Sequence, residues 1–233
     1  MKRSLEPVVW HISQSRVDFR EAEAFMMKRA ALISRNEARE LIWLLEHDSI
    51  YTAGMSAKPK DLILPTRFNV LTTGRGGQYT YHGPGQRVVY VMLDLKTRCD
   101  RDVRKFINRL QRWIIRALTE LGVSGVVRKD RVGVWVERFF RGGDREDKIA
   151  ALGIRLHRWV SLHGFALNVS VDLSHYDGIV PCGISDHGVT SLEDLAIDVD
   201  LHDVDRAILG AFREEFGIDV LKPDEADRVC GFI

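Results

Sequence analysis

Four strand-like segments follow one another in the second half of the chain without a helical pattern between them. Residues 125–127, 132–136, 148–156 and 159–169 are rich in apolar and β-branched side chains and are separated by turn residues. The polar stretch RGGDRED at residues 141–147 is expected to be a hairpin loop within this run. Consecutive strands joined by turns favour a mixed or antiparallel sheet over a doubly wound parallel one.

Helical patterns lie before and after this run. Apolar residues recur at helical spacing in residues 18–34, 100–121 and 200–216, and further strands are expected at 40–47, 49–53, 68–73 and 87–95. Helices and strands are therefore interspersed, which predicts an α/β or α+β fold. No linker rich in Pro, Gly or Ser divides the chain, so we expect a single domain over residues 1–233.

Charge and cysteine content narrow the classes of function. The chain has 34 Lys+Arg and 33 Asp+Glu, and this balance argues against a dedicated nucleic-acid-binding protein. Its apolar runs are much shorter than the roughly 20 residues of a membrane helix. Three scattered cysteines do not make a disulfide framework. We therefore expect a cytoplasmic protein.

A glycine-rich stretch, RGGQYTYHGPGQ at residues 75–86, is the most unusual part of the sequence. It contains neither a P-loop nor a dinucleotide-binding fingerprint. Its glycines would allow a substrate to approach the backbone closely, and its N–H groups can bind a carbonyl oxygen or an oxyanion. The alternative is a glycine-rich hairpin with ordinary turn functions.

Cys182 is the cysteine with the best local setting for chemistry. Pro181 fixes the backbone on one side and Gly183 gives the thiol no bulky cover on the other. A nucleophilic cysteine needs such access together with a lowered pKa. The alternative is a small buried hydrophobic residue. Cys99 and Cys230 are interpreted as incidental.

Lys148 opens the strand-like segment KIAALGIRL, whose small residues leave space beside the strand. A lysine in that place can stabilise a thiolate or, once desolvated, accept a proton from a thiol. The alternative is a solvated lysine at the start of a strand. The eight histidines form no HExxH motif and no CxxC pair is present, so we expect no metal site.

Taken together, these motifs resemble the lipoyl(octanoyl) transferase family. The resemblance rests on RGGQYTYHGPGQRVVY at residues 75–90, KIAALGIR at 148–155, LHGFALN at 162–168 and Pro181-Cys182-Gly183. EHDSIYTAG at residues 46–54 is similar to an earlier strand and turn of that family. The chain departs from the family pattern at Val180, where an asparagine is frequent, and in the charged stretch at residues 141–147.

The resemblance implies a mixed β-sheet flanked by helices, similar to the catalytic domain of biotin and lipoate protein ligases. It implies an acyltransferase of lipoate biosynthesis that moves an octanoyl group from octanoyl-acyl carrier protein to a lysine of a lipoyl domain. The implied acceptors are the lipoyl domains of 2-oxoacid dehydrogenases and the glycine cleavage H protein. No cofactor, nucleic acid or membrane is implied.

The same resemblance implies roles for individual residues. Cys182 matches the cysteine that carries the acyl-thioester, and Lys148 matches the residue that lowers the pKa of its thiol. During proton transfer Lys148 would change between cation and base, with His82 as a second proton carrier. Backbone donors near Gly76, Gly77 and Gly153 are expected to bind the oxyanion. The implied substrate-binding residues are Arg75, Gly76, Gly77, Gln78, Tyr79, Thr80, Tyr81, His82, Ala151, Leu152, Gly153, Gly164, Phe165 and Ala166.

Three alternatives remain open at this point. An ATP-dependent lipoate–protein ligase would not need Cys182, and the sequence has no GRGRxGR motif. A non-catalytic module that binds lipoyl domains or the acyl carrier would need neither Cys182 nor Lys148. A cysteine hydrolase would pair Cys182 with His163 or His187. For an acidic carrier protein we expect a local basic patch, either Arg138, Arg141 and Arg145 or Arg101, Arg104 and Lys105.

Overall fold

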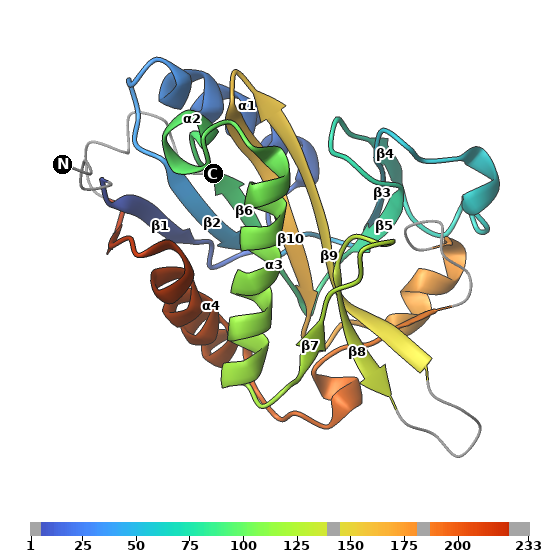
Figure 1. The fold of residues 1–233 in the computed structure, drawn as a ribbon. Coiled ribbons are helices and arrows are strands. Elements are labelled where there is room, and N and C mark those ends of the chain that lie inside the picture. The colour runs from blue at the N-terminus through green and yellow to red at the C-terminus, as the bar shows by residue number, and fades with distance from the viewer. Residues whose placement is uncertain (1–5, 139–144, 181–186, 224–233) are drawn as a thin grey trace.

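The protein contains two β-sheets of unequal size, with the large sheet at its centre and the small one at its side (Figure 1). The structure is a computed structural model that describes residues 6–138, 145–180 and 187–223. Within these residues the large sheet has the strand order β12-β1-β2-β6-β10-β9-β8-β7, with β11 paired to β9. The small sheet has the order β4-β3-β5. Parallel and antiparallel pairs occur in both sheets, so the predicted mixed sheet is confirmed.

Eight of the strands lie close to predicted segments, with several shifts at their ends, whereas β1, β5, β11 and β12 were not predicted. The large sheet consists of β1 (Val8–Ile12), β2 (Leu41–Leu45), β6 (Gln86–Met92), β7 (Gly125–Val126), β8 (Val134–Arg138), β9 (Arg145–His157), β10 (Val160–Asn168), β11 (Gly188–Val189) and β12 (Val220–Leu221). The small sheet consists of β3 (Ile50–Ala53), β4 (Val70–Thr72) and β5 (Tyr79–His82).

Helices cover both faces of the large sheet. On one face, α3 (Val103–Glu120) and α4 (Leu201–Phe216) pack side by side, and the rings of Trp113 and Phe212 lie 5.1 Å apart between them. On the other face, α1 (Phe19–Ser34) packs its apolar side against β2, β6 and β10. The short helix α2 (Leu95–Arg98) follows β6. The sheet thus separates two apolar layers.

Aspartates define where the helices begin. The side chain of Asp18 accepts hydrogen bonds from the backbone N–H groups of Arg20 and Glu21, and Asp102 and Asp200 cap α3 and α4 in the same way. Such caps satisfy N–H groups that have no partner inside the helix. The three predicted helices are therefore present, each beginning immediately after its capping aspartate.

Two predictions about strand ends were wrong. Residues 145–147 were expected in a loop but belong to β9, where they pair with β8 in an antiparallel register. Their charged side chains can lie in a strand because they form ion pairs there. Asp147 pairs with Arg145 of the same strand and with Arg138 of β8. The strand expected to reach residue 95 ends at Met92, because Asp94 caps α2.

Candidate active site

A narrow cavity lies on the α1 side of the large sheet, where β6, β10 and β9 run next to one another. Its volume is about 40 Å³, and residues of the small sheet and of the glycine-rich stretch contribute to its lining. The residues that line it are Arg75, Thr80, His82, Val88, Tyr90, Ala151, Leu152, Gly153, His163, Gly164, Phe165 and Ala166.

The register of three strands explains why the cavity lies there. Side chains on one face of a sheet recur every second residue, so cross-strand partners form rows. Two such rows carry mostly small residues and form the cavity floor. Val88, Ala166 and Ala151 are partners in one row, and Tyr90, Gly164 and Gly153 are partners in the next.

The glycines of the second row cannot carry a side chain without displacing the backbone. A Cβ at Gly164 would lie 2.2 Å from the carbonyl oxygen of Val89, and one at Gly153 would lie 2.9 Å from that of Gly76. Both distances are far shorter than a van der Waals contact. The glycines therefore allow the glycine-rich stretch and β6 to approach β9 and β10 closely.

Arg75 brings a positive charge to the cavity wall. Its Nη2 donates hydrogen bonds to the carbonyl oxygen and to the Oγ1 of Thr52 at 2.8 and 2.7 Å, and its Nη1 donates to the carbonyl oxygen of Gly76 at 3.1 Å. These contacts with neutral acceptors fix the position of the guanidinium group at the cavity wall.

A chain of hydrogen bonds fixes the protonated nitrogen of His82. The Nδ2 of Asn168 donates to the carbonyl oxygen of Thr190 at 2.9 Å, so its Oδ1 accepts from the Nε2 of Gln86 at 3.0 Å. The Oε1 of Gln86 is then left as the acceptor for the Nδ1 of His82, 2.7 Å away. His82 therefore carries its proton on Nδ1, and its Nε2 is unprotonated.

Two further histidines lie close to this ring. His47 donates from Nδ1 to the carbonyl oxygen of Val17 and accepts the hydroxyl of Tyr90 at Nε2, both at 2.6 Å. His163 has a φ of +59° in the middle of β10, and its ring lies beside those of Phe19 and Tyr90 on the α1 side. The positive φ interrupts the alternation of the strand and places an imidazole at the cavity.

Burial keeps all three imidazoles neutral. It lowers the pKa of His47 to about 4 and that of His163 to about 3, and it holds the pKa of His82 well below its usual value. The positive charge of Arg75 adds to this effect at His82 and His163. At neutral pH these rings therefore act as hydrogen-bonding groups rather than as cations.

The neutral histidines predict a loss of stability in mild acid. Their contribution is complete above the unfolded-state pKa of about 6.5 and is lost as the pH falls toward the lower folded-state values. Asp205 has the opposite effect on stability. Burial raises its pKa to about 6, so protonation of this carboxylate stabilises the folded protein as the pH falls. We expect the free energy of unfolding to fall by on the order of 3–4 kcal/mol between pH 7 and pH 5. Urea titrations would measure this change.

His47→Gln is the matched variant for that measurement. A glutamine amide can donate to Val17 and accept from Tyr90, as the imidazole does, but it does not titrate. The variant should therefore show a shallower loss of stability below pH 6.5 than the wild type. An unchanged pH dependence would show that His47 is not one of the responsible groups.

Lys148 lies in β9, three residues before Ala151, and is 4% exposed. Its Nζ has no hydrogen-bond acceptor among the described residues and lies 4.5 Å from the ring centre of Trp135. An ammonium group in such a place is available to an anion or to an oxyanion. The burial excludes the alternative of a solvated lysine.

Cys182 and its neighbours Pro181 and Gly183 lie outside the described residues. The chain is described on both sides of them. Before them, the N–H of Val180 donates to the carbonyl oxygen of Asp61 at 2.8 Å. After them, β11 pairs with β9, with Val189 opposite Lys148. Cys99 is buried in the core, which raises the pKa of its thiol, and Cys230 lies outside the described residues.

The remaining predicted substrate-binding residues lie beside the cavity but do not line it. The N–H of Gly76 donates to the carbonyl oxygen of Ile154 at 2.9 Å, so it is not free to bind an oxyanion as expected. Gly77 has a φ of +88° and accepts at its carbonyl oxygen from Ser56. The carbonyl oxygen of Gln78 accepts from Gly54. Tyr79 and Tyr81 belong to the core of the small sheet.

Three residues that line the cavity were not predicted to do so from the sequence. They are Val88, Tyr90 and His163. A signal for two of them was present. Alternation along the strand expected at residues 87–95 places Val88 and Tyr90 on one face, opposite the small residues of the neighbouring strands. The orientation of His163 had no such signal, because a positive φ inside a strand cannot be read from its sequence.

The basic patches expected for an acidic partner differ in their ion pairing. Arg138 and Arg145 both contact the carboxylate of Asp147, and Arg138 also pairs with Asp194. Their charges are thus largely compensated within the protein. Arg101 and Arg104 are exposed at the start of α3, whereas Lys105 pairs with Asp100. Arg141 lies outside the described residues.

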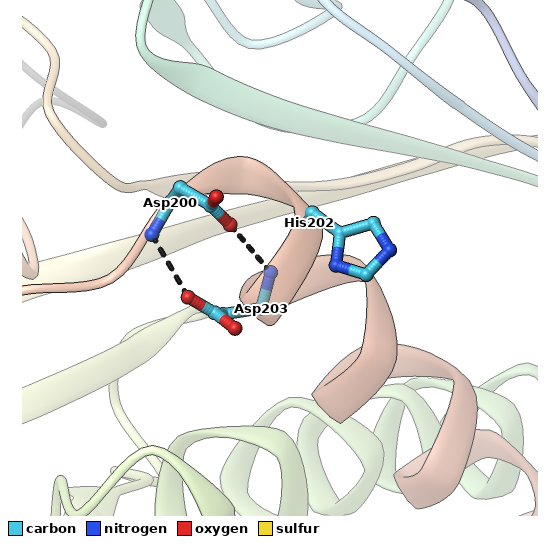
Figure 2. A group of neighbouring side chains, drawn as sticks. All are labelled: Asp200, His202 and Asp203. Carbon is cyan, nitrogen blue, oxygen red and sulfur yellow. Dashed lines mark hydrogen bonds between the residues drawn. The ribbon is translucent and has the colours of Figure 1, made fainter.

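One group of three neighbouring side chains has the residue types of a metal site. Figure 2 shows Asp200, His202 and Asp203 at the start of α4. The two carboxylates accept hydrogen bonds from each other's backbone N–H groups, as the dashed lines indicate, and so form a capping box. Capping the helix accounts for both aspartates.

The helices of the described segments are too short or too polar to traverse a lipid bilayer.

Comparison with known proteins gives consistent matches along the chain. Residues 18–213 match a family described as the lipoyl protein ligase A/B catalytic domain. The octanoyltransferase of Paramagnetospirillum magneticum is 57% identical over 213 residues, which cover 91% of this chain and 99% of that protein. The octanoyltransferase of Caulobacter vibrioides is 58% identical over 211 residues, covering 91% and 93% of the two chains.

A solved structure supports the fold independently. The bipartite lipoate protein ligase of Thermoplasma acidophilum matches with a TM-score of 0.69 and 16% identity, covering 97% of this chain and 91% of that one. The predicted mixed sheet flanked by helices, similar to a lipoate protein ligase, is therefore confirmed.

Proposed function

This chain belongs to the lipoyl protein ligase A/B catalytic domain family, and we propose that it is an octanoyltransferase, a single-domain acyltransferase of protein lipoylation. The observation that carries this proposal is the identity of 57% to a curated octanoyltransferase along almost the entire length of both chains. The donor would be octanoyl-acyl carrier protein, and the acceptor a lysine of a lipoyl domain. Cytoplasmic reducing conditions would suit a free cysteine nucleophile.

The cavity supports an apolar acyl substrate. Glycine and alanine form the floor, and the polar groups Arg75, Thr80 and His82 are contributed by the glycine-rich stretch and β5. An octanoyl chain lying along the floor would gain about 0.8 kcal/mol for each CH₂ group that it buries. Its volume exceeds the 40 Å³ of the cavity, so the side chains at the rim would move outward when it binds.

The first half of the reaction would form an acyl-enzyme. The Cys182 thiolate attacks the thioester carbonyl and a new carbon–sulfur bond forms. The carbon–sulfur bond to the carrier breaks, and the carrier's thiolate leaves and takes a proton from the Lys148 ammonium. One thioester replaces another, so this step needs no ATP. The Lys148 ammonium, buried and without an acceptor among the described residues, would stabilise the thiolate.

The second half would transfer the acyl group to the acceptor lysine. Its amine attacks the carbonyl of the acyl-cysteine, the amide bond forms, and the Cys182 thiolate leaves. The attacking nitrogen must lose one proton. Lys148 can take it in its neutral form, and the unprotonated Nε2 of His82 can accept a hydrogen bond from the attacking amine.

The proposal is tested by intact-protein mass spectrometry after incubation with octanoyl-acyl carrier protein in the absence of ATP. We expect a hydroxylamine-sensitive octanoyl adduct that maps to Cys182 and that moves to a lysine when a lipoyl domain is added. Modification that requires ATP and free octanoic acid would instead indicate a ligase. Release of free octanoate without transfer would indicate a hydrolase. The absence of any reaction would indicate a non-catalytic binding module.

The floor of the cavity predicts how chain length can be changed. Ala151 is half-buried and points from β9 into the row formed with Ala166 and Val88. Ala151→Val adds two methyl groups to that row and shortens the space for the acyl chain. We expect kcat/KM for an octanoyl donor to fall about tenfold relative to a hexanoyl donor, corresponding to one or two unburied CH₂ groups. Competition between the two donors measures this ratio, and an unchanged ratio would place the acyl chain elsewhere.

A further inference from the structure

We propose that Trp135 is a positioning residue for Lys148, which it holds in place without neutralising its charge. This inference rests on the proposed function, in which the Lys148 ammonium interacts with the reacting sulfur or oxygen. Nothing in the sequence motifs or in the relatives' names points to Trp135. The inference comes from the surroundings of the Lys148 side chain.

The contact between the two side chains is close and buried. Trp135 is 1% exposed and Lys148 is 4% exposed, and the Lys148 Nζ lies 4.5 Å from the centre of the indole ring. A cation within about 6 Å of an aromatic face is attracted by the ring's negative quadrupole, most strongly by that of tryptophan. The indole thus offsets part of the cost of burying the ammonium, although it accepts no proton and forms no ion pair.

The acidic side chains near Lys148 are already paired with arginines. Glu146, two residues before it in β9, contacts Arg128 and Arg131. Asp147, the preceding residue, contacts Arg138 and Arg145. Successive side chains of a strand point to opposite faces, so the Asp147 carboxylate lies on the other side of β9. Among the described residues no carboxylate forms an ion pair with Lys148.

The backbone is shaped to bring Trp135 opposite Lys148. The register of β8 and β9 shifts between Val134 and Trp135, so that Trp135 becomes the direct cross-strand partner of Lys148. Gly133, at the start of this irregularity, has a φ of +128°, and a Cβ there would lie 3.2 Å from the Lys148 Cε. The bulge and the glycine therefore make room for the lysine side chain beside the indole.

Other groups hold the indole itself. The guanidinium carbon of Arg131 lies 4.6 Å from its ring centre, and the His187 ring lies 5.3 Å away. Arg131 donates from Nη1 to the Nε2 of His187 at 2.6 Å. Among the described residues, the charged and titratable groups around Lys148 are thus Arg131, Glu146, Asp147 and His187. Within the same residues, Trp135 provides the cation–π contact to the ammonium.

The test compares Trp135→Phe and Trp135→Met with Trp10→Phe, a buried tryptophan that packs against Trp113 and Phe212 away from Lys148. Steady-state transfer from octanoyl-acyl carrier protein to a lipoyl domain gives kcat and KM, and urea unfolding gives stability. Spectra of protein labelled with ¹³C-lysine report the ε-methylene protons of Lys148, which are assigned by their loss in Lys148→Arg. In the wild type the indole ring current should shift these protons upfield.

We expect Trp135→Met to lower kcat about tenfold or more, with KM changed less than about twofold, and to abolish the upfield shift. Trp135→Phe should retain part of both, and Trp10→Phe should lose stability without losing kcat. The inference is overturned if Trp135→Met keeps full kcat, or if Trp10→Phe lowers kcat equally. If Lys148→Met itself has normal activity, then the proposed role of Lys148 has failed, and this outcome is distinct from a failure of Trp135.

Discussion

Replacing Cys182 with alanine is expected to lower the rate of octanoyl transfer by at least about a thousandfold, because the reaction loses its nucleophile. Binding of the donor should persist, since the residues that line the cavity are unchanged. Intact-protein mass spectrometry should show no octanoyl adduct on the variant. A sensitive assay of lipoyl-domain modification then measures the residual rate.

Cys99→Ala is the matched control for this variant. Cys99 forms no disulfide and is fully buried in the core, and burial raises the pKa of its thiol. Its replacement should reduce stability and leave the octanoyl adduct intact. A Cys182→Ala protein that still modifies the lipoyl domain at a near-normal rate would show that the acyl-thioester mechanism is wrong.

Lys148→Met is expected to slow transfer by about a hundredfold, which is typical of the loss of an acid–base group. The methionine retains most of the side-chain volume but neither stabilises a thiolate nor accepts a proton. Lys148→Arg separates these two roles, because arginine keeps the charge and does not lose its proton. We expect this variant to form the acyl-enzyme faster than Lys148→Met, but to remain slow in transfer to the acceptor.

Rapid-quench measurement of the two half-reactions distinguishes the outcomes. Lys96→Met serves as a control, since this lysine pairs with Asp94 near α2 and lies outside the cavity lining. If Lys148→Arg keeps full activity in both halves, then only a positive charge is needed. The proton of the attacking amine would then go to another group, and His82, with its unprotonated Nε2, is the first to examine.

The helices α1, α3 and α4 could be predicted because their signals are local, although α3 begins at Val103 instead of residue 100 and α2 was not predicted. Asp18, Asp102 and Asp200 mark the helix starts, and the apolar stripes continue from them. The strand β1 was not predicted, because it is defined by pairing with β2 and with β12, which is more than 200 residues away in the chain. Likewise, β5 lies inside a stretch that looked like a glycine-rich loop, and it is a strand because β3 pairs with it.

The candidate site could be predicted in part for a similar reason. The sequence motifs contain Arg75, His82, Ala151 and Gly164, and the strand register brings these residues to one cavity. The surroundings of Lys148 could not be predicted, because they depend on the register shift that places Trp135 opposite it. A shift of one residue between two strands leaves no mark in the amino-acid sequence.

The small residues in the floor of the cavity also affect how the protein responds to its substrate. These two rows contain glycine and alanine at positions where a sheet usually buries larger side chains. The protein without substrate therefore lacks part of the apolar packing that larger side chains would provide. An acyl chain in the cavity would supply this missing apolar contact. Binding of the acyl chain would then add to the free energy of unfolding that the side chains provide. The melting temperature of the protein would therefore rise as the cavity is occupied.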